Sequence, residues 1–249
     1  KGYFDRFWSR LIFPINNKNG DVIAFAGRIL SKKDNVAKYV NSPETPLYNK
    51  SNVFYGLDKA VDTIREKKFV IIVEGYFDLM QLYQANIKNV IAVSGTSFTK
   101  LHALQIKQYT KNIFIAFDGD SAGTNAAIKT GYTLLHNSVN AKIINTPDNL
   151  DPDDWIQEEG AEVFNNAIKD ASPTIHFHYN CYSQNDEKTN INEFIQQSVD
   201  EICLIDDPIF REICIKELSE NKNWMLINTK IAEIITFDGW LNNLFISFA

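Results

Sequence analysis

The sequence predicts an α/β fold: a parallel sheet flanked by helices, preceded by part of a mixed α/β basic segment and followed by a helical segment. Short continuous apolar runs alternate with helical patterns between residues 69 and 146. A polar, glycine-containing turn separates two apolar runs near the start, and helical spacing dominates residues 155–220. Alternating strands and helices with short connections favour a parallel sheet.

The first region reads as a hairpin followed by an irregular stretch. Apolar runs at residues 11–15 and 22–25 flank the polar turn at 16–20, and this pattern is typical of two paired strands. Residues 39–49 contain two prolines, which predict a loop rather than a regular element.

The central region repeats a strand–helix rhythm. Each apolar run is short and continuous, as expected for strands buried on both faces. The strands are expected at residues 69–73, 90–93, 113–117 and 141–144. Helices are expected at residues 77–84 and 122–136. A third helix is expected to begin after a Thr99 cap, with Leu101, Leu104, Ile106 and Tyr109 as its apolar positions. In such sheets, function collects beyond the carboxyl ends of the strands.

The last region is predicted to be helical. Pro208 lies near a helix start, and Ile209, Ile213 and Leu218 fall on roughly one face of that helix. Residues 221–249 are aromatic-rich and carry no readable motif. We therefore divide the chain into residues 1–66, 67–154 and 155–249.

Charge is distributed unevenly along the 249 residues. The formal net charge is −6. Residues 1–70 carry +6, residues 71–150 carry +1, and residues 151–249 carry −13. A basic first segment leaves room for a phosphate-binding face, although charges that only solvate the surface remain the alternative.

Composition excludes several classes of protein. Apolar content of 45% is enough for a core, and the absence of a run of 18 apolar residues argues against a membrane span. Three separated cysteines without a Cys-x-x-Cys pair predict a reduced, cytoplasmic chain with no zinc site. The first residues contain no secretory signal core and no initiator methionine, so we expect a fragment.

Acidic residues follow the expected strands. Glu74, Asp118 and Asp120 each come just after a strand-like run, so their side chains should converge at one sheet edge. If strand geometry persisted to Asp120, it and Asp118 would project to the same side. Two carboxylates about 4 Å apart repel by about 4 kcal/mol at an effective dielectric of 20. With no basic residue beside them in the sequence, such a cluster needs a hard divalent cation.

Five segments carry a family resemblance. They are Lys38–Thr45, Val73–Asp78, Ser94–Thr96, Phe117–Gly123 and Leu150–Asp154. The second and fourth resemble the signature segments of the Toprim fold, which bacterial primases and topoisomerases share. The first segment, with Tyr48–Lys50, Phe54–Leu57 and Asp5–Arg10, is similar to bacterial DnaG-type primases. The resemblance covers about residues 1–170.

This resemblance implies DNA-templated synthesis of short RNA primers by two-metal nucleotidyl transfer. Two ions, Mg²⁺ or Mn²⁺, are expected at the matched acidic positions. These are Glu74, Asp118 and Asp120, supported by Asp78, Asp151 and Asp153. Glu74 is also the best candidate for proton transfer. The matched nucleotide- and template-binding positions are Arg6, Arg10, Arg28, Lys38, Asn41 and Lys50, while Trp8 stands where the family often has another arginine.

The resemblance also implies partners and a place of action. The partners are a single-stranded DNA template, ribonucleoside triphosphates, an RNA–DNA hybrid, and a replicative helicase contacted through a module not present here. The family's zinc-binding module is absent as well. The expected location is the bacterial cytoplasm, at the nucleoid-associated replication fork.

Three alternatives remain. A topoisomerase needs a nucleophilic tyrosine, normally on a separate domain, and this chain shows no such domain. A Toprim nuclease would cleave DNA with metal and without nucleotides. A non-catalytic scaffold that binds DNA or partners could lose its acidic ligands, whereas this chain retains them.

Overall fold

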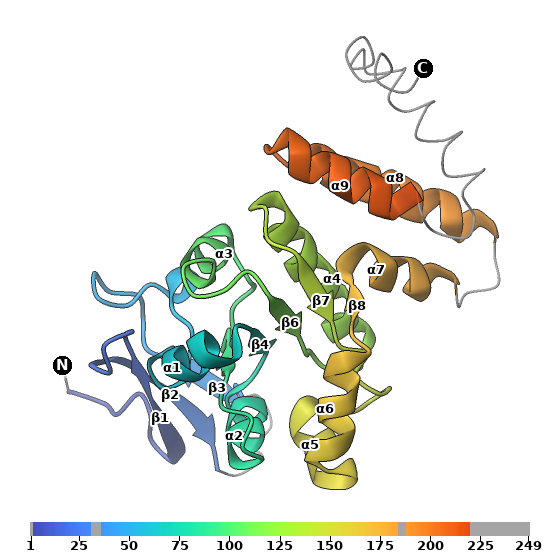
Figure 1. The fold of residues 1–249 in the computed structure, drawn as a ribbon. Coiled ribbons are helices and arrows are strands. Elements are labelled where there is room, and N and C mark those ends of the chain that lie inside the picture. Colours follow the sequence, from blue (N-terminus) through green and yellow to red (C-terminus); the bar gives the residue numbers. More distant parts are fainter. Residues whose placement is uncertain (1, 31–35, 184–187, 220–249) are drawn as a thin grey trace, which may run out of the picture.

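A computed structural model describes residues 2–30, 36–183 and 188–219. Within these residues the chain forms two sheets and a set of helices (Figure 1). The expectation that residues 221–249 carry no readable motif concerns a segment outside the described residues.

The first sheet has three antiparallel strands in the order β1-β2-β3. They are β1 (Arg10–Asn16), β2 (Val22–Ile29) and β3 (Tyr39–Asn41). The predicted hairpin is confirmed, but the loop prediction for residues 39–49 is wrong at its start, since residues 39–41 pair with β2. Phe13 and Ile15 of the sheet pack against Tyr76, so this sheet is fastened to the central region.

The second sheet has five strands in the order β5-β4-β6-β7-β8. They are β4 (Val70–Val73), β5 (Val90–Ala92), β6 (Ile113–Ile115), β7 (Ala141–Ile143) and β8 (Ser172–Pro173). The first four are parallel, as predicted, and β8 joins β7 in the antiparallel direction. The sheet therefore draws its last strand from a stretch predicted to be wholly helical.

Helices cover both faces of this sheet (Figure 1). One face carries α1 (Leu57–Lys67), α3 (Lys100–Ile106) and α4 (Ser121–His136). The other carries α2 (Tyr76–Gln84), α5 (Pro152–Glu159) and α6 (Ala161–Lys169). Every residue of β4 is buried, which explains why its sequence is a continuous apolar run rather than an alternating one.

The remaining helices form a cluster beside α4. They are α7 (Thr174–Ser183), α8 (Lys188–Cys203) and α9 (Pro208–Ser219), and α7 also packs against β7 and β8 of the sheet. A short 3₁₀ helix, η1 (Lys50–Asn52), precedes α1. The shared core of the cluster includes Leu135, Ile175, Phe194 and Leu218. In Figure 1, α8 and α9 lie beyond the end of the sheet. None of the described helices is long and apolar enough to cross a membrane.

Two predicted helix faces are partly wrong. On α3 and just after it, Ile106 is buried and Tyr109 packs on the core as predicted, but Leu101 and Leu104 are exposed while His102 and Ala103 are buried. On α9, Ile209 and Ile213 are exposed. Its buried face presents the predicted Leu218, together with Cys214, to the core of α4, α7 and α8.

Candidate functional site

Glu74 and Asp118 meet at the carboxyl edge of the parallel sheet. Glu74 directly follows β4, and Asp118 comes three residues after β6. The backbone N–H of Asp118 donates a hydrogen bond to Glu74 Oε1 at 3.4 Å. Burial, followed by the charge of Asp118, raises the pKa of Glu74 to about 7. Both groups are thus held in a place that penalises their ionisation.

Asp118 lies between opposite influences. Burial, Asp151 and Asp120 raise its pKa to about 6, and the Lys38 ammonium lowers it. The sequence had suggested no basic residue beside the cluster. That expectation is wrong, because the loop before β3 brings Lys38 to the acidic edge from another sheet.

Asp120 begins α4 rather than extending β6. Its Oδ1 accepts a hydrogen bond from the Gly123 N–H at 2.7 Å, which caps the helix. Since β6 ends at Ile115, strand alternation does not set the direction of Asp118 and Asp120. A Cβ on Gly119 would lie 2.0 Å from the Pro147 carbonyl oxygen. That glycine therefore allows close backbone packing.

Asp78 is the most buried of the predicted acidic residues, with 5% of its surface exposed. It accepts a hydrogen bond from the Gly75 N–H at 2.8 Å, which holds the loop between β4 and α2. Burial is the main reason that its pKa rises to about 7. Asp78 therefore positions the loop that carries Glu74.

A third acidic group begins α5. Oxygen atoms of Asp151, Asp153 and Asp154 lie within 4.8 Å of one another. Asp151 caps the helix by accepting the Asp154 N–H at 2.7 Å. Asp154 was not among the predicted site residues, although the Asp-Pro-Asp-Asp run was visible in the sequence. Burial, the largest cause, raises the pKa of Asp153.

The donor set fits a divalent cation. It consists of carboxylate oxygens, the ligands that Mg²⁺ and Mn²⁺ prefer. Burial first, and then neighbouring carboxylates, raise the pKa values of Glu74 and Asp118, and a bound cation would offset both effects. The acidic edge and the Asp151–Asp154 cluster are therefore consistent with divalent metal binding.

The predicted basic residues divide into two groups. The charge of Lys38 lowers the pKa of Asp118, and the charge of Arg28 lowers that of Asp153. The Arg28 guanidinium also lies 4.1 Å from the Phe77 ring centroid. Arg6 and Arg10 instead donate to backbone carbonyls. Arg10 reaches the carbonyl oxygens of Gly27, Ala37 and Lys38 at 3.1, 3.0 and 3.3 Å. It thereby ties the Lys38 segment to β2.

Asn41 connects the two sheets. Its side-chain amide donates to the Ser94 carbonyl oxygen at 3.4 Å, and its side-chain oxygen accepts the Tyr76 hydroxyl at 3.4 Å. The Arg6 guanidinium donates to its backbone carbonyl at 3.3 Å. Lys50 lies in η1, and within the described residues its side chain makes no contact with the carboxylates.

One residue of this neighbourhood had no signal in the sequence. Lys129, on the third turn of α4, lines the same cavity as Glu74 and the loop that follows β5. No motif marks it, and only the packing of α4 against the sheet brings it there.

Comparisons with known proteins agree with this arrangement. A family model described as "DNA primase catalytic core, N-terminal domain" matches residues 1–61, and one described as "Toprim-like" matches residues 71–156. A DNA primase domain from Pseudomonas aeruginosa is 32% identical with a TM-score of 0.77, and the match covers 87% of this chain and 69% of that chain. The chain belongs to the DnaG primase family.

Other DnaG relatives extend the comparison. A DnaG primase catalytic domain bound to single-stranded DNA is 32% identical with a TM-score of 0.73, covering 87% of this chain and 71% of that one. A primase from Listeria monocytogenes is 35% identical over 221 residues, covering 87% of this chain and 35% of the relative. One from Staphylococcus aureus is 33% identical, with coverages of 87% and 36%. The chain thus spans about a third of the length of these curated DnaG primases.

Proposed function

We propose that this chain is the catalytic part of a primase that joins ribonucleotides into short RNA primers on a single-stranded DNA template. The observation that carries the proposal is the meeting of Glu74 and Asp118 at the Toprim sheet edge, with the charge of Lys38, the residue before β3, acting on Asp118. A nucleotidyl transferase needs carboxylates for divalent ions and a cation near the substrate phosphates.

The reaction joins two nucleotides and releases pyrophosphate. The primer 3′-hydroxyl oxygen forms a bond to the α-phosphorus of the incoming triphosphate. The bond from that phosphorus to the oxygen bridging to the β-phosphate breaks, and pyrophosphate departs with those electrons. Divalent ions, when bound, lower the pKa of the attacking hydroxyl and stabilise the charge on the departing oxygen.

The acidic residues have distinct proposed roles. Glu74, Asp118 and Asp120 hold the ions, with two Mg²⁺ or Mn²⁺ ions expected, and Glu74 is the candidate acceptor of the hydroxyl proton. Asp151 and Asp153 support the ions from the start of α5. Asp78, through its bond to Gly75, supports the placement of Glu74.

The basic residues are proposed to handle phosphates. Lys38 and Arg28 face the acidic edge and are the candidates for contact with the incoming nucleotide. Arg6, Arg10, Asn41 and Lys50 are assigned to the template and the growing RNA–DNA hybrid. Such binding depends mainly on phosphate contacts, so we expect it to weaken steeply with salt. A replicative helicase at the bacterial replication fork is the partner that primer synthesis implies.

The test is incorporation of labelled ribonucleotides on single-stranded DNA with Mg²⁺ or Mn²⁺. The unmutated chain is compared with Asp118→Asn, which removes a charge without changing volume. Asp148→Asn is the matched control, because Asp148 is an exposed aspartate outside the cluster. We expect RNA from the unmutated chain and the control, and a loss of at least about 100-fold in Asp118→Asn.

Full activity in Asp118→Asn would contradict the site assignment. If the folded chain makes no RNA, the same preparations are tested for relaxation of supercoiled DNA and for DNA cleavage without nucleotides. Either activity would support another Toprim reaction in place of primer synthesis.

A further inference from the structure

The cavity lined by Glu74 and Lys129 opens between the sheet edge and α4. Its volume is about 360 Å³. Glu74, Phe117 and the loop at residues 95–98 line one side, and Ala126, Lys129 and Thr130 of α4 line the other. Glu74 and Lys129 are the charged side chains among these lining residues. The cavity therefore adjoins the proposed reaction centre without containing the Lys38 segment.

The loop after β5 lines this cavity and carries backbone N–H groups that have no acceptor among the described residues. Ser94 and Gly95 both have positive φ, 52° and 81°, which turns the chain sharply. The Ser94 N–H is bonded to the Glu74 carbonyl oxygen at 2.9 Å, and the Thr99 N–H to His102 Nδ1 at 3.2 Å. Between them, the four N–H groups of residues 95–98 find no acceptor within the described part of the chain.

Such a run of donors favours an anion. Successive backbone N–H groups in a turn can form concave anion sites, and Gly95 and Ser97 are exposed, so an anion from solvent can reach this turn. The conformation of this loop is fixed from outside, since Asn41 bonds the Ser94 carbonyl and the Thr99 hydroxyl donates to the Ser51 carbonyl at 2.6 Å. The donors are therefore held in place before any ligand arrives.

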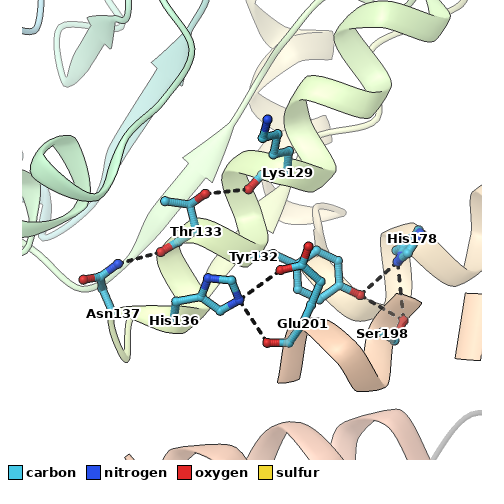
Figure 2. A network of polar contacts seen from close by, with 8 residues as sticks. All are labelled: Lys129, Tyr132, Thr133, His136, Asn137, His178, Ser198 and Glu201. Atoms are coloured by element: carbon cyan, nitrogen blue, oxygen red, sulfur yellow. Dashed lines mark hydrogen bonds and ion pairs between the residues drawn. The ribbon is translucent and has the colours of Figure 1, made fainter. Parts of the chain in front are cut away.

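Lys129 supplies the positive charge on the opposite wall. Its backbone carbonyl accepts the Thr133 hydroxyl at 2.9 Å, and its ammonium has no acceptor among the described residues. Figure 2 shows the Lys129 side chain pointing away from the network formed by Tyr132, His178 and Ser198. The ammonium is thus available to the cavity.

We propose that this cavity binds linked phosphates, which are the β- and γ-phosphates of a nucleoside triphosphate or free pyrophosphate, with Lys129 as their positioning residue. This inference rests on the proposed function and adds to it the place that receives the leaving group. Because Glu74 lines the same cavity, its charge repels an anion unless a divalent ion balances it. Binding is therefore expected to require Mg²⁺ or Mn²⁺.

The arrangement matches the direction of the reaction. As the α-phosphorus binds the attacking 3′-oxygen, the bridging oxygen and its electrons leave with the pyrophosphate. The free N–H groups and Lys129 would then face the group on which negative charge accumulates. Donors fixed in advance stabilise such charge without reorganising.

The first test follows the amide signals of residues 95–98 by NMR while pyrophosphate is added with Mg²⁺. We expect these four amides to shift in the unmutated chain and to shift much less in Lys129→Gln. Lys111→Gln removes the same charge from an exposed lysine outside the cavity lining, and should behave like the unmutated chain. Unchanged amides in the unmutated chain at saturating pyrophosphate and also at saturating ATP would overturn the proposal.

The second test measures equilibrium binding of ATP and AMP with Mg²⁺. Lys129→Gln should weaken ATP binding about tenfold, because a charge-assisted contact is lost, and should leave AMP binding unchanged. Lys129→Arg should restore most of the loss. Equal weakening of ATP and AMP, or no weakening of either, would contradict a site for linked phosphates. Amide shifts at residues 95–98 with ATP but not with pyrophosphate would identify the triphosphate tail as the ligand. Amide shifts with both ATP and pyrophosphate would show that the cavity also binds free pyrophosphate.

These experiments can reject the phosphate site and the proposed function independently of each other. If the cavity binds pyrophosphate but no RNA forms on single-stranded DNA, the phosphate site stands and primer synthesis is wrong. If RNA forms normally with Lys129→Gln and its amide shifts equal those of the unmutated chain, primer synthesis stands and the phosphate site is wrong.

Discussion

The two ends of α4 carry polar clusters of opposite character. At its first turn, Asp120 joins the acidic edge, where burial and neighbouring carboxylates raise the pKa values of Glu74 and Asp118. Farther along, the Tyr132 hydroxyl is bonded to His178 Nδ1 and to Ser198 Oγ, both at 2.9 Å (Figure 2). The helix α4 thus links a cluster of carboxylates with raised pKa values to a cluster whose side chains hydrogen-bond one another.

The difference separates groups that hold the fold from groups available to a ligand. His178 is 4% exposed, and burial lowers its pKa to about 4, so it is neutral in its network. A buried polar network stabilises a fold when each member has a partner. At the other end, Glu74 and Asp120 accept backbone N–H bonds and Lys38 lowers the pKa of Asp118. The pKa values of Glu74 and Asp118 nevertheless stay raised, as expected of groups that bind a cation. Substitutions at each cluster should therefore affect different properties.

The largest expected effect on stability is at Tyr132. Tyr132→Phe removes a hydroxyl shared by two buried partners, leaving His178 and Ser198 with only their 3.4 Å contact. The free energy of unfolding should fall by about 1–3 kcal/mol. Chemical denaturation measures this, and pyrophosphate-induced amide shifts at residues 95–98 should remain. A stable variant with altered nucleotide binding would mean that this network belongs to the site.

Lys38→Ala should act in the opposite way. Lys38 is exposed and is held near Asp118 by its backbone, so its loss should weaken nucleotide or template binding about tenfold. Stability should change by no more than about 0.5 kcal/mol, as for other surface substitutions. Fluorescence binding assays and thermal melting, run on the same preparations, would show the contrast. A lowered melting temperature with normal binding would reverse the assignment.

Without metal, Asp118→Asn should stabilise the chain at pH 8. The pKa of Asp118 is raised to about 6 in the folded state from an ordinary value of 3.8. The folded chain therefore holds this proton more tightly, and the associated stability is lost as pH rises through about 6. A neutral asparagine avoids that loss, so the free energy of unfolding at pH 8 should be higher by about 1 kcal/mol, a value reduced to allow for the partial exposure of the side chain. Melting in chelator from pH 8 to 4 should show this advantage shrinking, while Mg²⁺ should stabilise the unmutated chain more.

The smallest effect is expected at the rim of the network in Figure 2. His136 Nε2 lies 3.0 Å from Glu201 Oε2, and both side chains are partly exposed. Such ion pairs contribute about 0–1 kcal/mol, so Glu201→Gln should change the free energy of unfolding by less than Tyr132→Phe does. A larger loss would show that the network extends through Glu201.

Much of the fold could be predicted because its signals are local. The fully buried β4 appears as a continuous apolar run, and Thr99 caps α3 as its sequence suggested. The paired strand at residues 39–41 and the two-residue β8 could not be predicted, since each exists only through its neighbour. Likewise, Ile209 and Ile213 were predicted on the same face as Leu218, and only the packing of α9 showed that Cys214 joins Leu218 in the core while those two stay exposed.

The sequence by itself determined the acidic set and its strand-end positions, because chain order and apolar runs place Glu74 and Asp118 after neighbouring strands. Only the tertiary structure decided what surrounds them. Lys38 reaches Asp118 from the other sheet, Asn41 fixes the loop after β5, and Lys129 closes the adjoining cavity from α4. These approaches join residues far apart in the chain, where no local pattern operates and only packing of the two sheets and their helices sets the distances.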